Sequence, residues 1–204
     1  GSISSQIEQH FVIAYDETTE SLRSVLSDSS KNIRVINQSE SDSGVHKLSI
    51  IFDVLKDNSS FAKDVKREIG LPSSTQITSE RFIQTLVNHI DDVIDNSSKI
   101  QRARRNYESV SRDIARAGII HVVAGGNEGT VIDDLRRDGI RFESDFMDNI
   151  LANQYKVIVG ASDDRGTASY SDDVIAQFSL PNDPTVVIDG VGIRTNQGTR
   201  SGTS

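Results

Sequence analysis

The sequence predicts an α/β fold with three layers, in which helices flank a mostly parallel sheet. The domain is expected to be incomplete and to contain a helical insertion. Three observations support this class. Compact apolar runs alternate with segments of helical periodicity, the joins between them are short, and 204 residues are enough for one such domain with a core. Hydrophobic residues make up 35% and charged residues 25% of the chain, as in globular proteins. We therefore expect residues 1–204 to form a single partial domain.

The first expected unit is a strand, a helix and a second strand. Residues 11–15 (FVIAY) are a compact apolar run of the kind found in buried strands. Asp16 and Thr18 follow and would cap a helix. Residues 33–39 (IRVINQS) read as the next buried strand, and the short joins predict a right-handed parallel unit.

Residues 40–98 are expected to be a helical insertion within this domain. The stretch 47–55 (KLSIIFDVL) is ambiguous between strand and helix, whereas 61–69 reads as a short helix. Ser79 would cap a longer helix with one apolar face. The segment has too few apolar residues to form a hydrophobic core of its own. We therefore interpret it as an insertion and not as a second domain.

The second half of the chain continues the alternation of helix and strand. Apolar residues recur at helical spacing from Lys99 to Ala117, and Gly118 suits the end of that helix. Strands are expected at 119–124, 155–162 and 185–193, a short helix at 143–152 and a closing loop at 194–204.

Composition excludes several classes of function. The formal net charge of −8 argues against a nucleic-acid partner, because phosphate binding needs clustered Lys and Arg; the one dense basic cluster, residues 101–105, fits a solvated helix face. The absence of Cys excludes disulfides, thiolate chemistry and Cys-zinc sites. No apolar run approaches the length of a membrane span, so we expect no membrane partner.

The stretch 124–129 (AGGNEG) is the first candidate site, because it follows an apolar run directly. Glycines let the backbone turn sharply and let another molecule approach closely. Asn127 supplies a directed amide donor that a bare turn does not need, although Asn also tolerates the left-handed turn conformation. This stretch could also be interpreted as a phosphate-binding loop, but the chain lacks both Gly-x-Gly-x-x-Gly and a P-loop lysine.

Four segments, in this order along the chain, resemble the subtilisin-like serine proteases (the subtilase family). They are 11–39, which leads into an Asn-x-Ser segment; 111–130, similar to that family's helix, strand and Ala-Gly-Asn-x-Gly loop; 155–172, similar to its Val-Gly-Ala … Ala-Ser-Tyr-Ser strand; and 200–204 (RSGTS), similar to its nucleophile motif. The resemblance covers most of the chain outside the insertion. It implies a subtilisin-like fold, serine endopeptidase activity on protein or peptide substrates, and a secreted or extracytoplasmic location.

The resemblance also implies roles for individual residues. Ser204 matches the nucleophile, and Asn127 matches the oxyanion donor that acts with the backbone N–H of Ser204. Contacts with extended substrate are implied for Ser39, Glu40, Ser41, Ala124, Gly125 and Gly126, and Glu128 beside them would favour basic substrate side chains. The chain departs from the pattern at Ser41, where the family usually has Gly, and at 188–190, where Ile-Asp-Gly replaces Ala-Pro-Gly.

Calcium is common in this family, yet the sequence places no calcium or other cofactor site. Asp163, Asp164, Asp172 and Asp173 do not have the spacing of a Ca²⁺ loop, so we interpret them as solvated carboxylates.

The catalytic triad of the family runs Asp, His, Ser along the chain. Its Asp strand and His helix precede the segment that resembles 11–15, so we expect both motifs to be absent and the four histidines to be ordinary surface or core residues. A serine without a base is a poor nucleophile, and the isolated chain is therefore predicted to be inactive. A non-catalytic peptide-binding module on the same scaffold is the alternative. Missing early strands would also leave one sheet edge unpaired, which predicts self-association.

Overall fold

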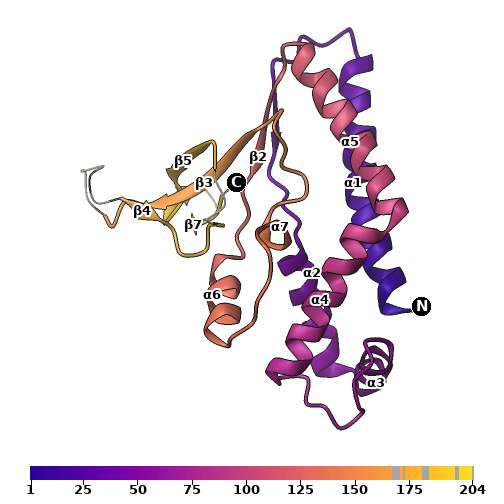
Figure 1. Cartoon of the computed structure of the whole chain (residues 1–204). Helices are drawn as coiled ribbons and strands as arrows, with labels where there is room; N and C mark the ends of the chain where they lie inside the picture. The colour runs from indigo at the N-terminus through magenta and orange to yellow at the C-terminus, as the bar shows by residue number, and fades with distance from the viewer. Residues whose placement is uncertain (167–170, 172, 181–183, 196–197, 204) are drawn as a thin grey trace.

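The computed structural model describes residues 1–166, 171, 173–180, 184–195 and 198–203 of an α/β protein with a mixed, mostly parallel sheet (Figure 1). The strands are β1 Val35–Gln38, β2 Ile120–Ala124, β3 Val157–Asp163, β4 Val174–Ile175 and β5 Val186–Asp189. β1, β2, β3 and β5 pair in parallel in that order, and β4 pairs with β3 in antiparallel fashion. The predicted mostly parallel sheet is therefore confirmed.

The described residues include seven helices. They are α1 Ile3–Ser27, α2 Gly44–Asp57, α3 Ser59–Glu68, α4 Glu80–Asn96, α5 Ser98–Arg116, α6 Gly129–Arg137 and α7 Ser144–Met147. The two longest, α1 and α5, lie side by side along the sheet (Figure 1). Their apolar residues join those of α2, α3 and α4 in one continuous hydrophobic core.

The strand expected at residues 11–15 is wrong, because these residues belong to α1. The helix begins much earlier, where the Ser2 side chain accepts a hydrogen bond from the N–H of Ser5. Its buried residues recur every three or four positions, namely Ile3, Ile7, Phe11, Tyr15, Thr19 and Leu22. Asp16 and Thr18 lie within this helix and cap nothing, so the expected strand–helix–strand unit is a helix followed by β1.

The helical reading of residues 40–98 agrees with α2, α3 and α4, and the ambiguous stretch 47–55 is helical. Ser79 caps α4 as expected, and Ser97 caps α5. The helix expected from Lys99 to Ala117 is confirmed as α5. Gly118 follows it with a φ of 73°, the left-handed conformation that suits the residue after a helix.

Helix α6, the two-residue strand β4 and the hairpin near the C-terminal end were not predicted. Helix α6 begins at Gly129 without a side-chain cap, so the usual start signal is missing. The expected closing loop contains a two-stranded hairpin, β6 Ile193–Thr195 and β7 Gly198–Arg200. The short helix expected at 143–152 is confined to α7, and the apolar segment 185–193 contains β5 and the first residue of β6.

Helices α1 and α5 cover only one face of β1 and β2. Val35 and Ile120 are register partners on the opposite face, and they are 55% and 54% exposed. Side chains alternate between the two faces of a strand, so their neighbours Ile36 and His121 point toward the helices. Within the described residues, the three-layer expectation is thus not met at these two strands.

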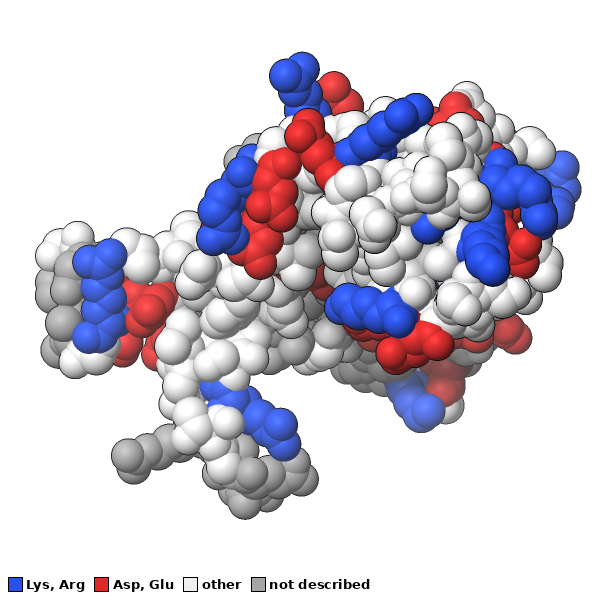
Figure 2. Space-filling view, turned by 90° about the horizontal axis from the view of Figure 1, so that it is seen from below, with Lys and Arg blue, Asp and Glu red and all other residues white. Residues whose placement is uncertain are grey.

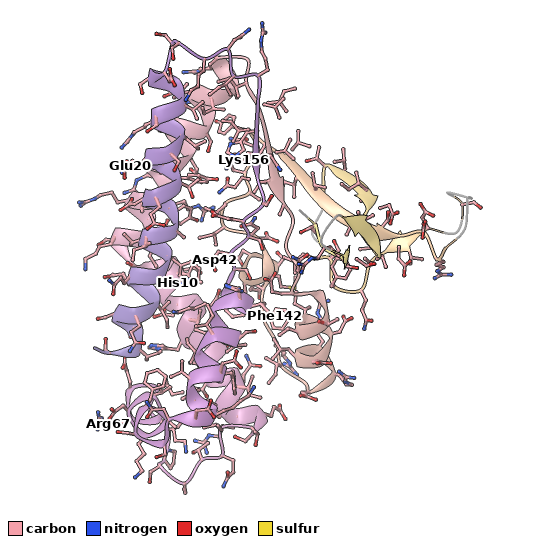
Figure 3. The ribbon with its side chains drawn as sticks, turned by 180° about the vertical axis from the view of Figure 1, so that it is seen from behind. His10, Glu20, Asp42, Arg67, Phe142 and Lys156 are labelled. Atoms are coloured by element: carbon pink, nitrogen blue, oxygen red, sulfur yellow. The ribbon has the colours of Figure 1, made fainter. Side chains whose placement is uncertain are left out.

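A small polar group is buried between the sheet and α5. The Nζ of Lys156 lies 3.5 Å from Gln38 Oε1 and 4.2 Å from the centre of the Tyr107 ring, and Lys156 is 8% exposed. His121, 2% exposed, contacts the same Gln38 oxygen through Nε2 at 3.0 Å. Figure 3 shows Lys156 on the helical side of the sheet. Burial lowers the pKa of Lys156 to about 7 and that of His121 to about 4.

Candidate functional site

The loop after β2 contacts the C-terminal loop through Asn127. The backbone N–H of Thr203 donates to Asn127 Oδ1 at 3.1 Å, and the Thr203 hydroxyl donates to the same oxygen at 3.2 Å. The N–H of Gly126 in turn donates to the Thr203 hydroxyl at 3.3 Å. Ser204 lies outside the described residues, but its neighbour Thr203 is held against the predicted oxyanion residue.

These contacts also fix the orientation of the Asn127 amide. A backbone N–H can only donate, so the atom that faces Thr203 has to be Oδ1. The Nδ2 group is thereby turned away from Thr203, and no described residue accepts a hydrogen bond from it. Asn127 is exposed, so this N–H donor is available to a bound molecule.

The sheet explains why these two loops meet. β2 and β5 both run parallel to β3 on either side of it, so their carboxyl ends lie at the same edge. The C-terminal loop returns to that edge because the N–H of Gly202 donates to Gly190 O at 2.9 Å, directly after β5.

Gly125 and Gly126 are required by the fold itself. Gly126 has a φ of 119°, which L side chains rarely adopt, and a Cβ there would collide with the Leu180 side chain. A Cβ on Gly125 would lie 3.0 Å from Val159 O. The role of these glycines as a thin substrate wall stays a prediction, because local packing already explains both.

Asn149 joins the two predicted substrate segments, and sequence reasoning missed it. Its Nδ2 donates to Ala124 O at 2.7 Å and to Glu40 O at 3.3 Å. Its Oδ1 accepts from the N–H groups of Asp42 and Leu151 at 3.1 and 3.0 Å. Glu40, and with it the segment 39–41, is therefore joined through Asn149 to the end of β2. An asparagine after a short helix carries no signal that would have revealed this role.

Two histidines that we expected to be ordinary lie beside carboxylates at this edge. His10 Nε2 on α1 lies 2.7 Å from Asp42 Oδ2, and the two labelled side chains point toward one another in Figure 3. His46 Nδ1 in the first turn of α2 lies 3.5 Å from Glu128 Oε1. The hydrogen bond to Glu128 raises the pKa of His46 above its usual value.

The expected absence of an Asp motif needs one correction. Residues 42–44 do read Asp-Ser-Gly, although Glu40 and Ser41 rather than apolar strand residues precede them. Asp42 lies just before α2, where its Oδ1 accepts the N–H of Ser43 and its Oδ2 faces His10. The tripeptide therefore ends no buried strand. No His-Gly-Thr segment is present in the 204 residues.

A groove of about 720 Å³ runs between α1 and the segment 36–42. One wall is formed by one side of α1, from His10 to Leu22. The other wall includes all three predicted substrate residues Ser39, Glu40 and Ser41, and His121 also lines the groove. The groove is thus a concave surface that reaches the predicted substrate segment.

Three observations on the described residues concern metal ions, surface charge and membrane spans. They contain no group of three or more His, Cys, Asp or Glu side chains arranged to hold a metal ion. Asp163 and Asp164 accept backbone N–H bonds from Arg165 and Gly166, and Asp172 lies outside the described residues. On the face seen in Figure 2, Lys and Arg are interspersed with Asp and Glu. None of the described helices is long and apolar enough to traverse a bilayer.

Comparison of this chain with protein-family models, with curated proteins and with solved structures gave no match. The functional argument therefore rests on the contacts between the loop after β2, the segment 39–42 and the C-terminal loop.

We expect Gly129→Ala to destabilise the protein by about 1–3 kcal/mol. A Cβ at Gly129 would lie 2.7 Å from Ser179 O and would also collide with Gln177 O, both of them backbone atoms that cannot swing aside. Urea unfolding measures the loss, and Thr130→Ala at the adjacent exposed position is the matched control. Equal stability of the two variants would contradict the prediction, because it would mean that the backbone of 177–179 moves to accommodate the added Cβ.

Proposed function

We propose that this chain is the central part of a subtilisin-like serine endopeptidase domain, in which Ser204 attacks the peptide carbonyl and Asn127 stabilises the resulting oxyanion. The observation that carries the proposal is the double hydrogen bond from Thr203 to Asn127 Oδ1. It holds the residue before Ser204 against Asn127 and leaves the Asn127 Nδ2 donor exposed. Both features are what an oxyanion donor beside a nucleophile requires.

The chemistry of this arrangement is electrostatic. Attack on a peptide carbonyl moves negative charge onto its oxygen, and one N–H donor aimed at that oxygen lowers the barrier by about 3–4 kcal/mol, a magnitude that comes from subtilisin itself. The Glu128 carboxylate lies next to Asn127 and would oppose this charge. His46 lies 3.5 Å from Glu128, and this hydrogen bond raises the pKa of His46 and so favours its charged form, which would offset that effect.

The predicted substrate walls support the same proposal. Asn149 connects Glu40 O with Ala124 O, so the segment 39–41 lies beside 124–126 at the carboxyl edge of the sheet. Extended peptides bind proteins by adding to exposed backbone of this kind. A peptide laid along 39–41 would bring its carbonyl groups toward the Asn127 loop.

We predict that the 204-residue chain by itself does not hydrolyse protein. The segment Asp42–Gly44 is placed at a helix start, and no described histidine contacts the C-terminal loop to serve as its base. The measurement is turnover of a denatured protein substrate by the purified chain. Hydrolysis that disappears in Ser204→Ala but persists in Ser201→Ala, an exposed serine of the same loop, would contradict the prediction.

A peptide-binding module that does not cut its ligand is the second candidate, and the groove along 36–42 favours it. The reading frame around these residues separates the two candidates. An Asp-Thr/Ser-Gly strand and a His-Gly-Thr helix before residue 1, with Met-Ala after Ser204, support the enzyme. A frame without them supports binding alone.

A further inference from the structure

A cavity of about 330 Å³ lies between α4, α5 and the segment 145–155, which leads from α7 to β3 (Figure 1). This volume is within the range of small-molecule sites in proteins. None of the described residues that line the cavity belongs to β1, to the loop after β2 or to the C-terminal loop. β1 and β3 pair with opposite sides of β2, so strands that extend the sheet beyond β1 would leave this cavity open.

The carboxylates of this cavity outnumber its cations. Five of the lining residues are Asp or Glu, whereas Arg104 is the only Lys or Arg among those that the structure describes. Arg104 is already paired with Glu108, with 3.1 Å between Nε and Oε1. Asp91, Asp95 and Asp145 form no ion pair and no side-chain hydrogen bond with a described residue. The cavity therefore holds three carboxylates without an ion-pair partner.

Mutual repulsion of these carboxylates changes the protonation of Asp91. Partial burial, followed by the negative charges of Asp95, Asp145, Glu143 and Asp92, raises the pKa of Asp91 from 3.8 to about 6. Asp91 is still ionised at pH 7, so a positive charge bound beside it would stabilise the folded chain. Perturbed groups in a cavity are typical of functional sites.

A buried tyrosine offers the cavity a further polar group. Tyr15 on α1 lines the cavity and is only 4% exposed, yet its hydroxyl forms no hydrogen bond with a described residue. The hydroxyl of Tyr107, by contrast, donates to Leu151 O at 2.6 Å. Buried tyrosine hydroxyls normally have a partner. The hydroxyl of Tyr15 can therefore bond to a molecule held in the cavity.

The lining favours a ligand that is positively charged and longer than a single ion. The described residues contain no group of three or more His, Cys, Asp or Glu side chains arranged to hold a metal ion, so the three carboxylates are not placed to share one. One ammonium group would leave two of them uncompensated. Apolar side chains also line the cavity, namely Ile94, Phe146 and Ile150. Ammonium groups joined by methylene chains match both features.

We propose that the cavity between α4, α5 and the segment 145–155 binds a linear polyamine. Its ammonium groups pair with Asp91, Asp95 and Asp145 through charge-assisted hydrogen bonds. One of these groups also donates to the Tyr15 hydroxyl, and the methylene chain packs on Phe146.

This inference goes beyond the proposed peptidase activity and does not depend on it. Polyamine binding needs neither Asn127 nor the C-terminal loop, so binding and hydrolysis can fail separately. The two sites meet only at Asn149, which lines the cavity and connects the two predicted substrate walls.

The test is calorimetric titration of the full chain with spermidine at pH 7.5. We expect binding at one site, at least fivefold weaker binding of n-butylamine, and at least fivefold weaker binding of spermidine to Asp91→Asn/Asp145→Asn. Asp92→Asn/Asp113→Asn is the control, because it removes the same charge from two exposed positions outside the cavity. This control should bind spermidine like the unchanged protein.

A second variant tests the hydroxyl. Tyr15→Phe removes an oxygen that no described residue contacts, so the thermal midpoint should stay the same while spermidine binding weakens at least threefold.

Three outcomes would overturn the proposal. Equal weakening by the two double variants would show general attraction to an acidic protein. Displacement of spermidine by an equal concentration of CaCl₂ would show a metal site. Binding of a lysine-rich peptide that depends on Asp91 and Asp145, with no binding of spermidine, would make a protein partner the occupant.

Discussion

Lys156→Met is expected to make the protein more stable near pH 7, by about 2–4 kcal/mol, and to remove a rise in stability at alkaline pH. Burial lowers the pKa of Lys156 from 10.5 to about 7 in the folded protein. Between these two values the unfolded chain binds more protons than the folded one, so the free energy of unfolding rises with pH by up to about 1.4 kcal/mol per unit. Below pH 7 both states are charged, and the full cost of burial is present.

Methionine suits this test because it keeps the length of the side chain and its packing on Tyr107 without the charge. Urea unfolding between pH 6.5 and 9.5 measures the effect. The range stops there because burial also raises the pKa of Tyr15 to about 12, which lowers stability above pH 10. Lys63→Met, at an exposed position of α3, should leave the slope unchanged. A slope that is the same with and without Lys156 would contradict the prediction.

His121 is expected to act in the same direction at acid pH, since its pKa is also lowered in the folded protein. Burial lowers its pKa from 6.5 to about 4, so the unfolded chain takes up a proton first as the pH falls through this window. Stability should therefore decrease between about pH 6.5 and pH 4. Both side chains contact Gln38 Oε1, so the two titrations arise in the same buried polar cluster.

Sequence periodicity predicted most of the elements because each one buries a face of its own. α4 and α5 have capping serines and regular apolar stripes, and the predicted boundaries of both helices lie close to the observed ones. Residues 11–15 failed because five consecutive apolar residues fit a strand and a helix equally well. The apolar residues Ile3, Ile7 and Leu22 continue the helical spacing on both sides of this run and identify it as helix. They become informative only when the periodicity is examined over more than these five residues.

The candidate site was predictable only in part, for a similar reason. The resemblance implied that Asn127 acts with the backbone N–H of Ser204, so a contact between the Asn127 loop and the C-terminal loop was expected. The contacts of Asn149 with Ala124, Glu40 and Asp42, and the pairing of His10 with Asp42, join residues 25 to 109 positions apart, which no local pattern encodes. Such contacts depend on how α1, α2 and the loop after α7 meet. That arrangement is determined by tertiary packing and not by the spacing of residues along the sequence.

The second large effect is expected at Asn149. Replacing it by alanine should reduce the free energy of unfolding by about 3 kcal/mol or more. The residue is only 4% exposed, and its amide donates to two carbonyls and accepts from two N–H groups. A buried polar group left without a partner costs about 1–3 kcal/mol, and alanine leaves several in one place. Asn88→Ala, at an exposed position of α4, is the matched control and should change stability by less than about 0.5 kcal/mol.

The same variant tests whether Asn149 positions the site or only stabilises the fold. Ala124 O and Glu40 O belong to the two predicted substrate walls, so losing the amide should loosen both walls together with the Asn127 loop. Amide hydrogen exchange at Gly126 and Thr203 should then accelerate more than exchange at Leu86 in the core of α4. Uniform acceleration at all three positions would indicate a global loss of stability. Asn149→Asp restores the acceptor but not the donor, and since both carbonyls need a donor, it should leave the walls as loose as alanine does.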